Sequence, residues 1–226
     1  MPSSSLDKEL LKNIEDKNII AHAIRYWDEY AKASLCADDA YYASGIISLE
    51  SNLNRVFGRD PDKFDKILEI GCGAGRETFA LSDYCNGHVM AVDFSKEHIK
   101  IAKEKKPEYV NPTKIKFLVS DGISLNFGSN YFDFAYSFDA LPFSGSLSSV
   151  LTTLLEINRV LKKGGFAAIN IRTSKWDNRM PQELKEISAT PFSIDETLSW
   201  AKRCKFKYPS VIVNSVSASS WFLWSK

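Results

Sequence analysis

Three glycines and two aspartates are spaced along the middle of the chain in a way that suits a nucleoside site. Gly71, Gly73 and Gly75 occupy alternate positions directly after an apolar run, and Asp93 and Asp121 each end a later apolar run. Glycine allows a tight turn and lets a ligand approach the backbone closely. A carboxylate accepts hydrogen bonds from ribose hydroxyls or from a base amino group. The pattern predicts a glycine turn beside a ribose at Asp93 and an adenine at Asp121.

Each aspartate also has a purely structural interpretation. Asp93 stands just before Ser95, where a carboxylate can serve the first turn of a helix, and Asp121 precedes Gly122 in what reads as a turn. Both interpretations stay open at the level of sequence. The ligand interpretation is favoured because all the candidates follow successive predicted strands.

The glycine spacing argues against two common nucleotide-binding classes. The dinucleotide fingerprint G-x-G-x-x-G/A needs a small third residue for close packing of helix on strand, and Arg76 occupies that position. The chain also has no G-x-x-x-x-G-K-S/T phosphate loop. A nicotinamide or flavin dehydrogenase and a P-loop nucleotidase are therefore disfavoured.

Strand and helix patterns alternate along most of the chain and predict a parallel sheet with helices on both faces. The sequence predicts strands at 66–70, 88–92, 115–119, 132–137 and 166–171, and helices at 76–84, 95–105, 147–161 and 193–204. Strands at 209–216 and 220–224 are close enough for an antiparallel hairpin. Before the sheet we expect helices at 6–32 and 46–57 with a turn over 38–45, and after it an irregular stretch at 173–192.

Composition limits the classes of partner. The chain has 226 residues, a formal net charge of +1 and 44% hydrophobic residues, so neither a nucleic-acid nor a membrane partner is expected. Its four cysteines form no C-x-x-C pair, which argues against zinc, and no metal is expected. No secretory signal pattern is visible, and the expected location is the cytoplasm. The expected assembly is a monomer or a homodimer.

Five segments taken in order resemble the motifs of class I S-adenosylmethionine-dependent methyltransferases. They are LEIGCGAG (68–75), VDFS (92–95), VSDG (119–122), YFDFAYS (131–137) and EINRVLKKGGF (156–166). The resemblance implies an α/β, doubly wound, seven-stranded sheet in the order 3-2-1-4-5-7-6 with strand 7 antiparallel. It implies one structural domain, with residues 1–60 as a helical lid and 61–226 as the methyltransferase domain.

The resemblance also assigns roles in binding S-adenosylmethionine. The glycine turn and Glu69 would bind the methionine end, and Asp93 would bind the ribose. Residues that follow strands 2 and 3 would bind the adenine. The full set of expected cofactor residues is Glu69, Gly71, Cys72, Gly73, Gly75, Asp93, Phe94, Ser95, Asp121, Gly122, Ile123, Ser137 and Phe138. Leu81, Leu118 and Phe134 are expected in the core, and His88 and His98 are expected to be structural or solvated.

The sequence says less about the residues that would bind the methyl acceptor. Asp139 follows strand 4 and is a candidate general base, with a loop or capping carboxylate as its alternative. Candidate substrate residues are Tyr26, Trp27, Tyr41 and Tyr42, which could instead only pack, and Arg172, which could form a simple salt bridge.

Methyl transfer from a sulfonium needs mainly alignment of the acceptor and exclusion of water, so no universal catalytic residue is required. We expect direct transfer to a small-molecule acceptor held by the N-terminal helices and the loops after strands 4 and 5. Alternatives are methylation of a protein or RNA, and an inactive partner subunit that retains the fold.

Overall fold

A seven-stranded sheet forms the centre of the computed structural model, which describes residues 17–33, 39–57, 64–104, 112–141, 147–173, 192–213 and 219–226. The strand order is β3-β2-β1-β4-β5-β7-β6, as predicted. Neighbouring strands from β3 to β5 run parallel, whereas β7 is antiparallel to both β5 and β6. The strands are β1 (Phe64–Ile70), β2 (Cys85–Asp93), β3 (Ile115–Val119), β4 (Phe132–Ser137), β5 (Leu161–Arg172), β6 (Lys207–Val213) and β7 (Ser219–Ser225).

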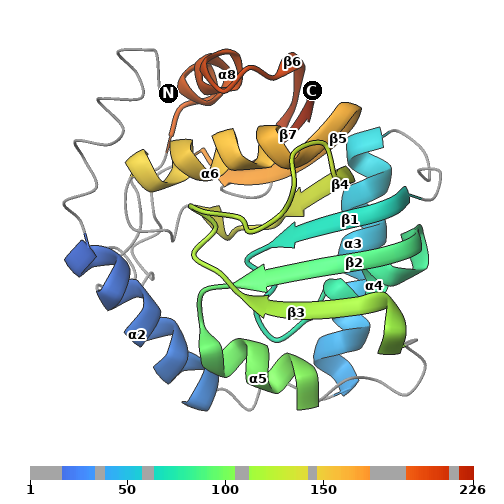
Figure 1. Ribbon diagram of the computed structural model, residues 1–226, viewed down its shortest axis with the longest axis vertical. Coiled ribbons are helices and arrows are strands. Elements are labelled where there is room, and N and C mark those ends of the chain that lie inside the picture. Colours follow the sequence, from blue (N-terminus) through green and yellow to red (C-terminus); the bar gives the residue numbers. More distant parts are fainter. Residues whose placement is uncertain are drawn as a thin grey trace.

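Helices cover the two faces of the sheet (Figure 1). The described helices are α2 (Lys17–Ala33), α3 (Asp39–Phe57), α4 (Thr78–Leu81), α5 (Lys96–Glu104), α6 (Leu147–Val160) and α8 (Ile194–Arg203), with short 3₁₀ turns at Ser82–Tyr84 and Pro112–Lys114. Successive strand residues enter different cores because side chains alternate across a strand. Ile67 packs with α3, α4 and α5, whereas Leu68 packs with α6 and α8.

The predicted helix starts at two serines are confirmed. The Ser95 hydroxyl accepts a 3.1 Å hydrogen bond from the His98 amide at the start of α5. At α8, the Ser193 side chain accepts from the Glu196 amide, and the Glu196 carboxylate accepts from the Ser193 amide. This reciprocal pair satisfies backbone donors that have no partner within the helix.

The predicted turn at 38–45 is wrong, because α3 already begins at Asp39. Gly45 suggested a turn, but it lies inside the helix and faces the backbone of Arg76. A Cβ at this position would stand 2.0 Å from the Arg76 carbonyl oxygen. The glycine therefore serves close packing of α3 against the glycine turn.

Other boundaries also differ from the prediction. The helix expected at 76–84 is reduced to α4 and a 3₁₀ turn, and β5 begins at Leu161 instead of 166. Leu81 and Phe134 are buried as expected, but Leu118 is 41% exposed and is not a core residue. Leu118 lies on β3, an edge strand of the sheet, where burial is incomplete.

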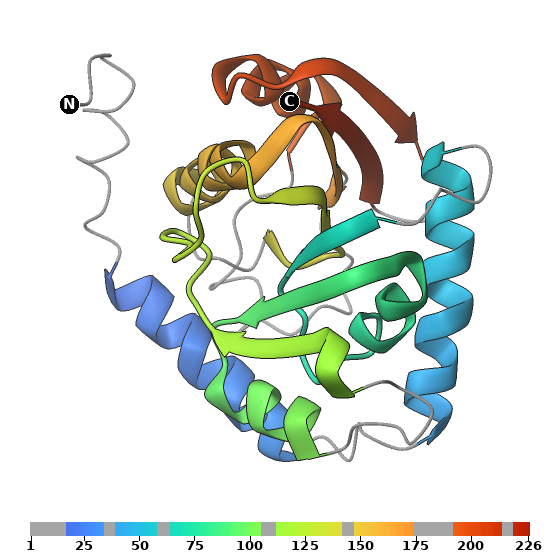
Figure 2. The same cartoon turned by 45° about the vertical axis from the view of Figure 1, so that its right-hand side comes forward.

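The two N-terminal helices occupy different places beside the sheet (Figure 2). α2 lies against α5, whereas α3 packs Leu49 and Leu53 into the core on the α4 side. Most of the helix predicted at 6–32 is thus present, although its first eleven residues lie outside the described part. Among the described helices, none has the length and apolar character needed to cross a bilayer.

Candidate active site

The glycine turn after β1 is bound to the end of β2. The amides of Gly71 and Cys72 both donate to the Val92 carbonyl, at 2.8 and 3.1 Å. Gly71 has φ +75°, and a Cβ there would lie 2.1 Å from Cβ of Ala140. Gly73 has φ +52° and opens onto free space, since a Cβ there would meet nothing within 4 Å. The turn therefore needs glycine for its conformation and leaves room beside it.

Asp93 connects this turn to the start of α5. Its Oδ2 accepts from the Gly73 amide at 2.8 Å, and its Oδ1 accepts from the Ser95 amide at 2.8 Å. Burial raises the pKa of the Asp93 carboxyl. The helix-terminus contact expected from sequence is thus present. Because each carboxylate oxygen can accept a further hydrogen bond, a role toward a ribose is compatible with it.

Three adjoining cavities follow the carboxyl ends of the strands. One of about 420 Å³ and one of about 110 Å³ share the walls formed by Trp27, Gly71, Gly73, His98, Phe138 and Asp139. A narrower one shares Gly71, Asp93, Phe94 and Ala140 with the second, and it extends toward Asp121 and Gly122. Together they form a trough from β3 to the glycine turn.

The β3 end of the trough carries the residues expected around an adenine. Oδ1 of Asp121 accepts from the amides of Ile123 and Ser124, at 2.9 and 3.2 Å, so the carboxylate organises its own turn. Gly122 is buried, with φ +73°, and its position faces Thr153 of α6. Asp121 and Gly122 line the trough, and their role toward a cofactor stays a prediction.

Glu69 and Cys72 lie at the end of β1 and are buried. Burial raises the pKa of Glu69 to about 8, and the nearby carboxylates of Glu77 and Asp93 act in the same direction. Among the described residues, Oε2 of Glu69 has no hydrogen-bond partner. Burial also raises the pKa of the Cys72 thiol, which makes it a poor nucleophile. Ser137 is buried as well, and its hydroxyl donates to the Ile70 carbonyl at 3.0 Å.

Asp139 lines the same two cavities as Trp27 of α2. It has φ +47°, and its Oδ2 accepts a 3.5 Å contact from Arg172 at the end of β5. Burial raises the pKa of the Asp139 carboxyl, while the Arg172 charge opposes that shift. The salt bridge foreseen for Arg172 is therefore present. Although Asp139 lines both of the larger cavities, its role as a base stays a prediction.

The α2 helix covers the trough with aromatic side chains. Trp27 lines both larger cavities and lies 6.2 Å from the His98 ring, centroid to centroid. Tyr26 packs edge-on against Trp27 at 5.4 Å. Oδ1 of Asp28 accepts from the Ser95 hydroxyl at 2.6 Å and from the Glu97 amide at 3.3 Å, which fastens α2 to the start of α5.

Sequence reasoning missed several residues of the trough. The ring of His98, a residue expected to be structural or solvated, lies near that of Trp27, and His98 also lines the two larger cavities. Arg76 and Glu77 line the cavity of about 420 Å³, where they form a 3.0 Å ion pair. The only signal for Glu77 was a carboxylate two residues after the last glycine of the turn. Tyr41 and Tyr42 lie in α3, but their side chains are outside the described part of the structure.

The described residues contain no cluster of three His, Cys, Asp or Glu side chains that could hold a metal ion. The donor set of the trough is instead one of backbone amides, carboxylates and aromatic rings. Such groups suit an organic cation with hydroxyl and amino groups.

Comparison with known proteins identifies the central segment. Residues 68–169 match the family model of a methyltransferase domain. The chain is 29% identical over 152 residues to a sterol 24-C-methyltransferase of Gibberella zeae, covering 63% of this chain and 39% of that protein. It is 35% identical over 105 residues to a demethylmenaquinone methyltransferase of Staphylococcus aureus, covering 46% and 41% of the two chains. The matches span about two-fifths of these relatives' length.

A solved structure extends the likeness in fold to most of the chain. An S-adenosylmethionine-dependent methyltransferase from Aquifex aeolicus superposes with a TM-score of 0.63 at 19% identity, covering 88% of this chain and 97% of that one. The matched segment contains the glycine turn, Asp93, Asp121 and Asp139. The central segment of the chain thus matches a methyltransferase domain, and most of the chain has the fold of an S-adenosylmethionine-dependent methyltransferase.

Proposed function

We propose that the protein transfers the methyl group of S-adenosylmethionine directly to a small-molecule acceptor. The observation that carries this proposal is the shared wall of the two larger cavities. The expected cofactor residues Gly71, Gly73 and Asp93 line the same trough as Trp27 and Asp139. A donor and an acceptor bound in one trough can be aligned for direct transfer.

The residues of the trough fit the cofactor. A carboxylate at Asp93 can accept from ribose hydroxyls, and Gly73 leaves space that any side chain would fill. The buried Oε2 of Glu69 offers an unused acceptor below the glycine turn, suited to an ammonium group directly or through water. Gly122 and Asp121 form the wall for the adenine.

When bound, S-adenosylmethionine supplies an activated methyl group on a sulfonium. The protein then has to hold the acceptor in line, exclude water and remove a proton where the acceptor carries one. Asp139 is the proposed proton acceptor, because burial moves its pKa toward neutrality and Arg172 holds the carboxylate in place. Trp27 and Phe138 supply apolar walls that exclude water.

The acceptor is proposed to enter between α2 and the ends of β4 and β5. Residues 1–60 serve as a lid in this proposal and residues 61–226 as the methyltransferase domain. The names of the two curated relatives, a sterol and a demethylmenaquinone methyltransferase, favour a small molecule. A net charge of +1 gives no support to a polyanionic acceptor.

The first test is calorimetry with S-adenosylhomocysteine, followed by transfer of radiolabelled methyl groups to a panel of sterols, quinones, phenols and amines. Binding with turnover of a small molecule supports the proposal. The same assay with cell protein and with total RNA forms its second arm, and label only in a macromolecule would overturn the small-molecule assignment. Binding without any turnover would instead indicate an inactive partner subunit.

A further inference from the structure

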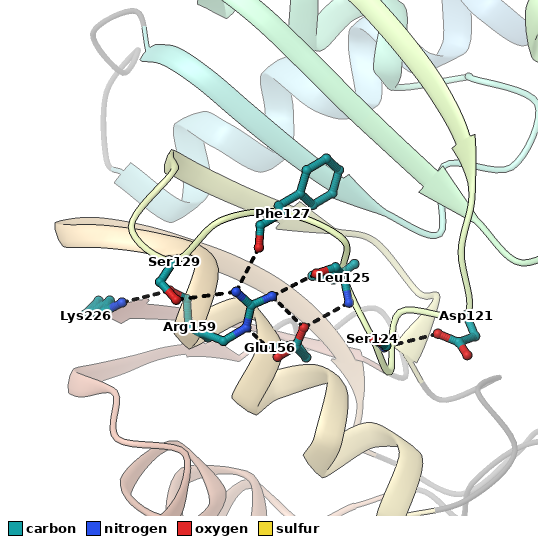
Figure 3. Close-up of polar contacts among 8 residues, drawn as sticks. All are labelled: Asp121, Ser124, Leu125, Phe127, Ser129, Glu156, Arg159 and Lys226. Atoms are coloured by element: carbon teal, nitrogen blue, oxygen red, sulfur yellow. Dashed lines mark hydrogen bonds and ion pairs between the residues drawn. The ribbon is translucent and has the colours of Figure 1, made fainter.

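The connection between β3 and β4, residues 120–131, carries the proposed adenine residues and is held along most of its length by α6 (Figure 3). Asp121 closes the first turn through the amides of Ile123 and Ser124. The next residue, Leu125, is buried, and its amide donates to Oε2 of Glu156 on α6 at 2.9 Å. The loop therefore passes directly from the adenine wall to an α6 carboxylate.

Arg159 continues this attachment, one helical turn after Glu156. Its guanidinium donates to the carbonyls of Leu125 and Phe127, both at 2.8 Å, and contacts the Ser129 hydroxyl at 3.4 Å. It also donates to both carboxylate oxygens of Glu156, at 2.6 and 2.8 Å. A planar guanidinium with fixed donor directions orders all these acceptors at once, which a lysine could not do.

The far end of the loop is attached to the same region. Lys226 Nζ donates to Oδ1 of Asn130 at 2.9 Å and to the carbonyls of Arg159 and Leu161, at 3.0 and 2.7 Å. The Asn130 and Tyr131 amides donate to the carbonyls of Arg159 and Val160. These contacts lie at the β4 end of the loop, and none of them involves the residues that line the narrow cavity.

The same helix also forms part of the adenine wall. Thr153, three residues before Glu156, lines the narrow cavity together with Asp121 and Gly122. Positions three apart are neighbours on a helix surface. One side of α6 therefore lines this cavity through Thr153 and holds the loop through Glu156.

We propose that Glu156 and Arg159 are positioning residues that preform the adenine subsite by fixing the loop at 121–127. This inference rests on the proposed function, since it assigns the subsite to the cofactor's adenine. A loop already fixed in the free protein loses little conformational entropy on binding, so the affinity for an adenosine ligand depends on the pair. Neither residue lines the described cavities, and the pair acts through Leu125 and Asp121.

The test compares Arg159→Gln with a matched control, Lys162→Gln. Lys162 forms a 2.5 Å ion pair with Asp133, and its side chain is 38% exposed, close to the 36% of Arg159. Lys162 lies just beyond α6, but its partner is on β4 and not in the loop. The measurements are the dissociation constant for S-adenosylhomocysteine by calorimetry, and amide hydrogen exchange of residues 121–131 in the free protein.

We expect Arg159→Gln to weaken S-adenosylhomocysteine binding by about tenfold or more, as the loss of charge-assisted hydrogen bonds would. Exchange of the Leu125 amide should accelerate, while Lys162→Gln changes neither quantity. At saturating S-adenosylmethionine, kcat should stay near the wild-type value because the reacting groups are elsewhere. If Arg159 and Lys162 had only a structural role, both substitutions would lower the free energy of unfolding, and neither would selectively weaken S-adenosylhomocysteine binding.

Unchanged affinity in Arg159→Gln, or an equal loss in Lys162→Gln, overturns the inference. If Arg159→Gln does not fold, Glu156→Gln replaces it and should show the same faster exchange at Leu125. A wild-type protein that does not bind S-adenosylhomocysteine would overturn the proposed function as well. If the wild-type protein binds S-adenosylhomocysteine and Arg159→Gln binds it with the same affinity, only the positioning role is overturned.

Discussion

The Gly73 amide donates a 2.8 Å hydrogen bond to Oδ2 of Asp93, so the residue expected to hold the ribose also fixes the turn expected beside the methionine. The other oxygen of the same carboxylate fixes the start of α5 at Ser95. A single buried side chain thus sets the relative position of the β1 turn and the β2 end. Cofactor affinity and local order should depend on it together.

Replacing Asp93 by alanine tests this double role. The variant should bind S-adenosylhomocysteine more weakly by about 1–3 kcal/mol, because hydrogen bonds to a charged carboxylate are lost. Calorimetry measures the affinity, and Asp83→Ala is the control, since Asp83 is exposed on a 3₁₀ turn. Wild-type affinity in Asp93→Ala would refute the ribose assignment.

Much of this part of the site could be predicted because its information is local. An apolar strand, a glycine turn and a strand-ending aspartate are adjacent in sequence, and parallel topology brings strand ends together. His98 and Glu77 could not be predicted in the same way. Their place in the trough depends on where α2 and α3 pack, and no short-range pattern encodes those contacts.

The clearest wrong prediction is the turn at 38–45, which was based on Gly45. Gly45 lowers helix propensity, so a pattern-based interpretation ends the helix there. The absence of a side chain at Gly45 instead allows close packing of α3 against Arg76, which is thirty-one positions later in the sequence. Leu118 shows the converse case, because an apolar residue in a strand predicts burial only where a neighbouring element covers it.

Gly45→Ala should therefore destabilise the protein, although alanine usually favours a helix. The added Cβ would lie 2.0 Å from the Arg76 carbonyl oxygen, and relief of such overpacking typically costs about 1–3 kcal/mol. Urea unfolding measures the change. Gly128→Ala is the matched control, since a Cβ there meets nothing within 4 Å and should change stability by about 0.5 kcal/mol or less. Equal stability of the two variants would contradict close packing at Gly45.

Glu69 should make stability depend on pH in the direction opposite to a salt-bridged carboxylate. Its pKa is about 8 in the folded protein against an ordinary value of 4.5. Between these values the folded state binds more protons than the unfolded state, so the free energy of unfolding falls as pH rises from about 4.5 to 8 and levels off above that.

Urea unfolding at pH 5 and pH 8 tests this sign. Glu69→Gln should reduce the fall in stability between the two pH values, whereas Glu50→Gln, at an exposed position on α3, should leave it unchanged. Glu77, Asp93 and Asp139 also have raised pKa values, so a smaller slope should persist in Glu69→Gln. An unaltered slope would mean that Glu69 is ionised in the folded protein.

Asp139 and Arg172 together predict a characteristic pH–rate profile. If Asp139 accepts the proton of the acceptor, Asp139→Asn should lower kcat by about 100-fold or more while cofactor affinity stays near wild type. The Arg172 charge lowers the pKa of Asp139, so Arg172→Met should move the acidic limb of the kcat profile to higher pH. An acceptor without a removable proton should be insensitive to both substitutions. Undiminished turnover by Asp139→Asn with a proton-bearing acceptor would remove Asp139 as the base and leave alignment by the trough as the source of rate.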